Sequence, residues 1–185
     1  MEKVVTEHYR AQLKQMHQDY ERFGTGAVTS KHYPMLTKFI EKRKYQSVLD
    51  YGCGKGDFLA HVQEKLPSIE VYGFDVANEK FPALPEKAVD LVVSLDVMEH
   101  IEFPLLANVL SQIRSRTNKA FVCSIANYAA AKTLADGRNA HINQFPFGQW
   151  FSILSMYFRV DQFMRTAGQE GVFYCSPLKL KSDWR

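Results

Sequence analysis

The sequence predicts an α/β fold in which helices cover both faces of a doubly wound, mainly parallel sheet. Three observations support this prediction. From residue 47 onward, strand-like aliphatic runs alternate with stretches of helical spacing, and a glycine-rich turn follows the first run. The run VDLVVSL at 89–95 is largely apolar, as in a strand covered on both faces. Composition agrees, because 46% of the 185 residues are hydrophobic, enough for one globular domain with a core.

Two helices are expected before the first strand. One spans 3–22, where apolar side chains recur at spacings of three and four, and the other spans 33–44, with a proline in its first turn. The apolar face of the first consists of Val5, Tyr9, Leu13, Met16 and Tyr20. Neither helix can bury its stripe alone, so we expect one domain, 1–185, with an N-terminal helical cap (1–45) and a core (46–185).

The core is expected to alternate strands and helices. Strands are predicted at 47–50, 70–75, 89–95 and 120–125, and helices at 57–66, 105–113 and 150–158. The segments 158–163 and 171–175 are predicted to close the sheet as an antiparallel pair.

The turn after the first strand, YGCGKGD at 51–57, is the most informative stretch. Gly52, Gly54 and Gly56 lack a Cβ, so the backbone can approach a ligand closely, and the helix starting near residue 57 directs free N–H groups to the same place. Asp75 follows Gly56 by nineteen residues and ends the next strand, where a carboxylate can accept both hydroxyl hydrogens of a ribose. The pattern predicts a nucleoside ligand.

This turn fits neither common phosphate-binding template. A dinucleotide motif would need a glycine in place of Asp57, and a P-loop would need Ser or Thr after Lys55, where Gly56 stands. Asp50, just before the turn, would repel a pyrophosphate and favour an ammonium group. S-adenosylmethionine (SAM) carries such a group.

At these positions the sequence resembles the class I SAM-dependent methyltransferases, whose first motif is an acidic residue followed by Gly-x-Gly-x-Gly. Here the motif is formed by Asp50, Gly52, Gly54 and Gly56, and Asp75 matches the ribose-binding acid of the family. The segment VDLVVSLDVMEHI at 89–101 resembles the fourth strand of the family, which often ends in Glu-His. The resemblance covers 47–126 and implies a Rossmann-like fold, a SAM-binding core and SAM as the cofactor, with Cys53 contributing its backbone.

The chain departs from that family after the second strand. Only thirteen residues separate Asp75 from Val89, too few for the usual helix, third strand and adenine-binding acid. We expect this unit to be shortened to a turn or short helix, so that adenine is held by the loop from Val76 and by Leu95 and Asp96. For Asp96, capping of the next helix is the equal alternative.

Two histidines are candidates for catalysis. His141 lies in a polar loop after the strand at 120–125, facing the expected methyl position, and is the candidate general base, with Arg138 or Asn139 as substrate contacts. A plain solvated loop is the alternative. His100 lies in the fourth-strand motif, where it either supports the fold or has a direct role in cofactor contact or catalysis.

Other polar and aromatic residues point to no separate site. Tyr9, Tyr20 and Phe23 either close over the site as a lid or pack in the core. No His, Cys and Asp cluster has metal-ligand spacing, so no metal site is expected. The three cysteines suit a reducing compartment, and neither a signal peptide nor a membrane-length apolar run is visible, so a cytoplasmic protein without membrane contact is expected.

The predicted function is methyl transfer from SAM to a small-molecule acceptor, with a hydroxyl of a sugar or metabolite as the leading choice. A formal charge of +3 is too small to indicate a nucleic-acid partner, yet it does not exclude one. An RNA or modified-nucleotide methyltransferase and a non-catalytic SAM-binding partner protein remain alternatives. Acceptor recognition must come from the N-terminal helices, the His141 loop or a second subunit, which leaves a homodimer open.

Overall fold

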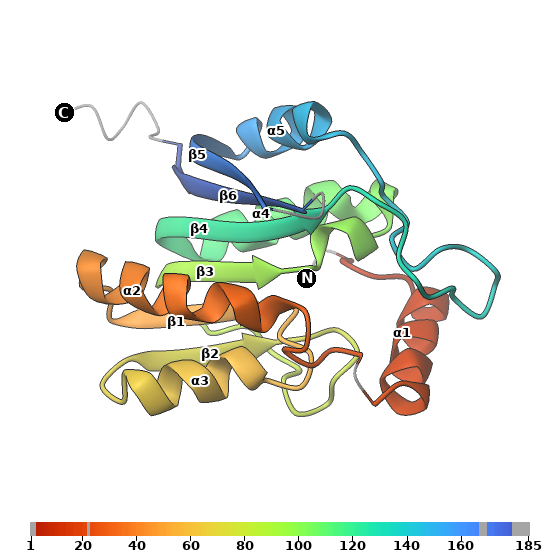
Figure 1. Ribbon diagram of the computed structural model, residues 1–185, viewed down its shortest axis with the longest axis horizontal. Coiled ribbons are helices and arrows are strands. Elements are labelled where there is room, and N and C mark those ends of the chain that lie inside the picture. The colour runs from red at the N-terminus through yellow and green to blue at the C-terminus, as the bar shows by residue number, and fades with distance from the viewer. Residues whose placement is uncertain (1–2, 22, 167–169, 179–185) are drawn as a thin grey trace.

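The computed structural model describes residues 3–21, 23–166 and 170–178 and contains one six-stranded sheet (Figure 1). The strand order is β2-β1-β3-β4-β6-β5. The neighbouring strands β2, β1, β3 and β4 run parallel to one another, whereas β6 is antiparallel to both β4 and β5. The strands are β1 (Ser47–Tyr51), β2 (Glu70–Phe74), β3 (Val89–Leu95), β4 (Thr117–Ala126), β5 (Phe158–Thr166) and β6 (Glu170–Pro177).

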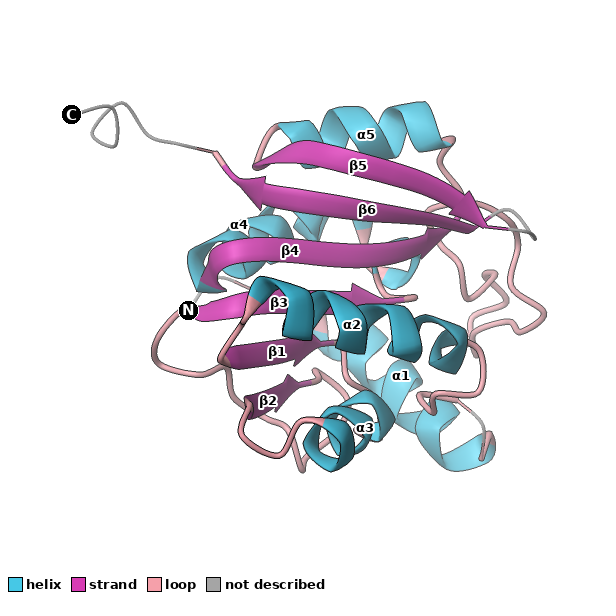
Figure 2. Ribbon diagram, turned by 60° about the vertical axis from the view of Figure 1, so that its left-hand side comes forward, coloured by secondary structure: helices cyan, strands magenta, loops and turns pink. Residues whose placement is uncertain are grey.

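Helices cover both faces of this sheet, as the sequence predicts (Figure 2). On one face, α2 (Tyr33–Arg43) and α3 (Asp57–Lys65) bury Leu36, Ile40 and Val62 against β1 and β3. On the other face, α4 (Leu106–Arg116) and α5 (Phe147–Ser155) bury a second cluster that includes Leu110 and Trp150. All seven residues of β3 are buried, because that strand lies inside the sheet between the two clusters.

The helix α1 (Glu7–Asp19) does not cover a face of the sheet. It lies beyond the carboxyl ends of the parallel strands, beside the long loop 127–146 that follows β4 (Figure 1). Tyr9 and Met16 of α1 pack there with Leu134 and Ala140 of the loop, as a third apolar cluster. Carboxyl ends of parallel strands are where α/β sheets place ligands, so α1 and the loop enclose the expected site.

Most expected elements are confirmed, and the differences lie at their ends. The first helix begins at Glu7 because Thr6 caps it, accepting a hydrogen bond from the Tyr9 amide. Tyr20 was expected on its apolar face, which is wrong: the helix has ended there, and Tyr20 is exposed. The helix expected at 150–158 is α5, which begins at Phe147 directly after Pro146 and ends earlier. The strand expected at 120–125 is longer on both sides.

The shortened unit after β2 is confirmed. Residues 75–88 form turns with neither a helix nor a strand, and they fold back so that the Asp75 amide donates to Phe81 O (2.9 Å). The Phe81 ring lies against the backbones of Gly56 and Gly73. The short segment 75–88 therefore still covers the glycine loop at Gly56, by means of the Phe81 ring.

The N-terminal helices occupy different places. α2 is part of the sheet packing, and only α1 lies over the carboxyl edge. The division into a cap (1–45) and a core (46–185) stays a prediction. In the described part of the chain, no helix is long and apolar enough to cross a membrane.

Candidate active site

A cavity of about 420 Å³ lies at the carboxyl edge of the sheet, walled by α1, the glycine loop and the loop 127–146. Its size is in the range of small-molecule sites. Candidates from four consecutive strand ends line it: Asp75 after β2, Asp50 at the end of β1, Asp96 after β3, and His141 in the loop after β4. The lining also includes Gly52, Cys53, Gly54, Val76, Leu95 and His100.

The glycine loop has a backbone that only glycine adopts easily. Gly52, Gly54 and Gly56 have φ of 81°, 54° and 89°, in the left-handed region. A Cβ on Gly54 would lie 2.2 Å from the carbonyl oxygen of Gly24. The absence of a side chain at Gly54 therefore lets the backbone of the N-terminal segment pack closely against the loop. Gly56 precedes α3 and does not line the cavity.

The amides of this loop are used inside the protein. Gly52 and Cys53 donate to Phe74 O, at 2.7 and 3.1 Å, and Lys55 donates to Gly24 O at 2.7 Å. Burial raises the pKa of the Cys53 thiol, which disfavours the thiolate form that a nucleophile needs. The loop therefore provides space for a ligand to approach the backbone. Polar contacts to that ligand must come from the side chains around the loop.

Asp75 points toward the glycine loop, as its spacing predicts. Its Oδ2 accepts the Gly54 amide (2.9 Å), and its Oδ1 accepts the Ala77 amide (2.8 Å). Each carboxylate oxygen has a second lone pair, so two ribose hydroxyls can still donate to this group.

Asp50 is a buried carboxyl at the end of β1 that faces the cavity. Burial, and then the charge of Asp75, raise its pKa to about 8. Such a group is protonated at neutral pH until a cation approaches it, when the ionised form is stabilised. Asp50 is therefore suited to a cationic group of a ligand.

Asp96 occupies a tight turn after β3 with a φ of 59°, which is uncommon for a residue with a side chain. Its amide donates to both the carbonyl oxygen (3.1 Å) and Oγ (3.0 Å) of Ser124 in β4. This anchoring holds the Asp96 side chain at the cavity. Glu99, one turn later, is fully buried and accepts the Ala126 amide; burial and then Asp96 raise the pKa of Glu99.

The two histidines meet at the same wall of the cavity. Their ring centroids are 4.8 Å apart and nearly perpendicular. Nδ1 of His100 lies 2.8 Å from Ala140 O, and Nδ1 of His141 lies 2.6 Å from Tyr128 O. Burial lowers the pKa of His100 to about 4, although the Asp96 charge opposes this shift. His100 is therefore neutral at pH 7.

Spacing in the sequence indicates no metal site, yet the fold brings Asp96, His100 and His141 together. One potential ligand atom from each lies within 4.8 Å of the others. The sequence does not reveal this cluster because His141 is distant in sequence from Asp96 and His100. It reaches them only because the loop 127–146 folds back toward the turn after β3.

Arg138 and Asn139, the expected substrate contacts, do not line the cavity. Arg138 pairs with Asp136 (2.7 Å) and lies over the Tyr9 ring. The Asn139 side chain holds the loop together through the amide and carbonyl of Ala130, at 2.9 and 2.8 Å. The geometry therefore gives their predicted role no support.

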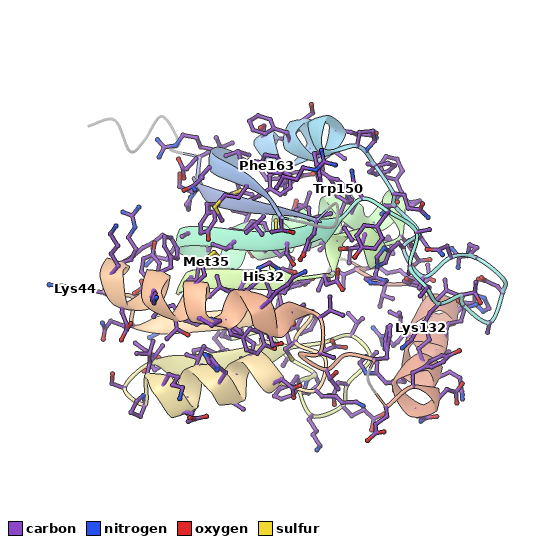
Figure 3. All side chains as sticks on the ribbon, in the orientation of Figure 1. His32, Met35, Lys44, Lys132, Trp150 and Phe163 are labelled. Carbon is purple, nitrogen blue, oxygen red and sulfur yellow. The ribbon has the colours of Figure 1, made fainter. Side chains whose placement is uncertain are left out.

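Other residues, not assigned to the site from the sequence, line the cavity instead. Tyr128 and Lys132 come from the loop after β4, and His17 comes from α1. Lys132 Nζ lies over the rings of Tyr20 (4.3 Å) and Phe23 (5.3 Å), and Figure 3 shows its loop facing α1. A loop without periodicity carries no sequence signal for which side chains turn inward. Only the aromatic residues of the N-terminal segment hint at a lid.

A family model described as a methyltransferase domain matches residues 9–159. The chain belongs to this methyltransferase family. It is a SAM-dependent methyltransferase, and its cofactor is SAM. The match includes the glycine loop, Asp75, His100, His141 and most of α1. No curated protein matches the sequence as a relative.

Solved structures share the fold of this methyltransferase. The PH0226 protein from Pyrococcus horikoshii is 16% identical, with a TM-score of 0.62 over 94% of this chain and 92% of that one. Magnesium protoporphyrin IX methyltransferase from Synechocystis, with bound S-adenosylhomocysteine, is 16% identical, with a TM-score of 0.65 over 91% and 98%. Burkholderia thailandensis 1,6-didemethyltoxoflavin-N1-methyltransferase is 14% identical, with a TM-score of 0.64 over 97% and 93%.

Proposed function

We propose that this methyltransferase transfers a methyl group to a hydroxyl of a small molecule, such as a sugar or another metabolite. The observation that carries the proposal is the cavity of about 420 Å³ at the carboxyl edge, in which Asp50 of β1, Asp75 just after β2 and the imidazoles of His100 and His141 line one space. The acidic residues suit an ammonium group and a ribose, and the two imidazoles suit a hydroxyl that must lose a proton.

In this proposal, the Asp50 carboxylate holds the ammonium group of SAM, the Asp75 carboxylate holds the ribose hydroxyls, and Val76, Leu95 and Ala77 border the adenine. When bound, SAM supplies a methyl carbon on a positively charged sulfur, which keeps the electron pair of the broken C–S bond. The acceptor hydroxyl lies against Asp96, His100 and His141, which bind it and help to remove its proton. Tyr128 and Lys132 border the acceptor, and α1 forms one wall of the site.

The walls of the cavity favour a small acceptor over RNA. Phosphate groups are bound by lysine and arginine, and among the described residues that line the cavity Lys132 is the only lysine or arginine. α1 and the loop 127–146 enclose the space through their shared apolar cluster. An acceptor of metabolite size fits such an enclosure. The Synechocystis and Burkholderia proteins, which share the fold, are named for small-molecule acceptors.

The test uses SAM labelled in its methyl group and cell extract divided into RNA and low-molecular-mass fractions. We expect label in the low-molecular-mass fraction, with a mass increase of one methylene and an O-methyl signal by NMR. Asp75→Asn is the control for enzyme-dependent transfer. Label that enters RNA, or a methyl group found on nitrogen or carbon, contradicts the proposal.

A further inference from the structure

We propose that Asp96, His100 and His141 form a binding site for one divalent transition-metal cation, which holds the acceptor hydroxyl oxygen. The acceptor rests on the proposed function, whereas the cation site rests on geometry alone. One potential ligand atom from each side chain lies within 4.8 Å of the others. Nitrogen and oxygen ligands bound to one such cation lie about 3 Å apart, given bonds of about 2.1 Å, so small side-chain rotations close the site.

The hydrogen bonds of the two imidazoles support this assignment. Each Nδ1 lies at hydrogen-bond distance from a backbone carbonyl, Ala140 O for His100 and Tyr128 O for His141. A carbonyl oxygen only accepts, so Nδ1 carries the proton in both rings and Nε2 keeps its lone pair. Histidine ligands of metal ions are held in this way, with the second ring nitrogen donating to a carbonyl or carboxylate.

The third ligand, Asp96, has a fixed backbone. Asp96 keeps a left-handed backbone, while two acceptors on Ser124 fix its amide. None of the ion pairs found in the described ranges gives the Asp96 carboxylate a lysine or arginine partner. One carboxylate and two imidazoles, without a basic side chain, suit a cation.

The ligand set and its position define what the cation would do. Two histidines and one carboxylate are typical of divalent first-row transition metals and leave coordination positions open. All three residues line the cavity, so the open positions face the space for the acceptor. A hydroxyl bound there loses its proton to water more readily, because the cation stabilises the alkoxide. His141 then acts as a ligand, and no side chain needs to take the proton.

The first experiment measures metal binding without activity. Protein stripped with a chelator is titrated with CoCl2, followed by visible absorption, and with MnCl2, followed by electron paramagnetic resonance. We expect one ion per chain, and at least tenfold weaker binding by Asp96→Asn, His100→Ala and His141→Ala. His8→Ala, which removes an exposed histidine outside the cavity, should bind as the wild type does. Equal binding by wild type and all three variants, or no binding by wild type, overturns the site.

A second measurement does not depend on the folding of the variants. The electron spin-echo spectrum of Mn²⁺ bound to wild-type protein should show nitrogen couplings from two imidazoles, and their absence overturns the assignment. Activity then separates the two proposals. Hydroxyl methylation that continues unchanged in stripped protein retains the proposed function and overturns the role of the cation. Metal binding with transfer to nitrogen or carbon retains the site and overturns the proposed function.

Discussion

At the scale of single residues, Asp50 has the most unusual setting among the expected cofactor contacts. It is buried, and its burial together with the charge of Asp75 raises its pKa to about 8, so it is protonated at pH 7. In an unfolded chain its carboxyl would be ionised at that pH. Asp50 is thus poised to lose a proton when a cation binds beside it.

This setting predicts that SAM binding at pH 7 releases nearly one proton, because the ammonium group stabilises the ionised carboxylate. Calorimetric titrations in buffers with different ionisation enthalpies measure the released proton. Asp50→Asn should bind more weakly and release none from this site. At pH 9 the wild type should also release little, since Asp50 is already ionised; a full proton released there would contradict the assignment.

Gly54 is the residue at which backbone conformation and close packing act together. Gly54→Ala adds the strain of a φ of 54° and a methyl 2.2 Å from Gly24 O. We expect it to lower the free energy of unfolding by about 3 kcal/mol and to weaken SAM binding. Gly137→Ala is the matched control, with a φ of 85° and no atom within 4 Å of the added methyl. It should cost about 1 kcal/mol in urea unfolding. Equal costs would show that the contact with Gly24 is unimportant.

The residues of the glycine loop, Asp50 and Asp75 could be found from the sequence because their spacing follows one strand–turn–helix–strand unit. Tyr128, Lys132 and His17 could not be found in this way. Their positions depend on how a long loop and a terminal helix fold over the sheet edge, and neither path has a period. Arg138 and Asn139 were chosen for their polarity, but pairing within the loop uses their side chains.

At the scale of elements, β3 has the bounds that the sequence predicts, because a central strand buried on both faces is apolar along its length. β4 begins earlier than expected, at Thr117, where it already pairs with β3; the sequence hides this start because Thr117, Asn118 and Lys119 are polar, and the latter two are exposed. Helix ends follow local capping, as at Thr6 and Pro146, which apolar spacing does not reveal.

The position of α1 depends on a few polar contacts in addition to its apolar face. The Tyr9 hydroxyl donates to the carbonyl oxygen of His100 (2.7 Å), and Thr6 bonds Glu102 through both its amide and its hydroxyl. These contacts join α1 to the turn that carries His100. A displacement of α1 should therefore also displace His100.

Tyr9→Phe tests this connection. Loss of the buried hydroxyl leaves the His100 carbonyl without this donor, so we expect the free energy of unfolding to fall by about 1 kcal/mol. Urea denaturation measures this fall in the free energy of unfolding. Amide hydrogen exchange in α1 should also become faster in the variant. Tyr72→Phe is the control, because Tyr72 is exposed and its hydroxyl donates to the nearby Glu70. Exchange in α1 that is equal in both variants would argue against the coupling.

At the scale of the whole molecule, one buried ionic contact joins the N-terminal segment to the last strand. His32, just before α2, bonds Glu170 of β6 (2.8 Å), and Lys31 pairs with the same carboxylate. Figure 3 places His32 where α2 meets the sheet. Burial raises the pKa of Glu170, but these two partners outweigh it and hold the pKa at about 2.

Stability should therefore fall as pH decreases from about 5 toward 2. The folded-state pKa of Glu170 lies below its unfolded value, so its contribution is present above the unfolded pKa and is lost as the folded carboxylate is protonated. We expect this contribution to be about 2 kcal/mol. Glu170→Gln should flatten that part of the pH profile in urea unfolding. Glu79→Gln, at an exposed ion pair, is the control and should not. The same slope in Glu170→Gln would contradict the assignment.

The overall arrangement was largely predictable, because strands that alternate with helices permit few topologies and consecutive strand ends meet at one edge. The shortened unit followed from counting thirteen residues after Asp75. The metal-ligand cluster was not predictable, since it forms only when the loop after β4 returns His141 to the turn after β3. The residues proposed to bind the cofactor were thus visible in the sequence, whereas those proposed to bind the acceptor required the fold.

The central claim is that SAM binds in the cavity at the carboxyl edge, with Asp75 at its ribose. The most direct test is calorimetric titration of SAM into wild type, Asp75→Asn and Asp75→Ala, with Asp161→Ala on the exposed edge strand as a control. We predict one SAM per wild-type chain, at least tenfold weaker binding by both Asp75 variants, and unchanged binding by the control. If folded Asp75→Asn and Asp75→Ala bind SAM as tightly as the wild type, the cofactor lies elsewhere and the account is wrong.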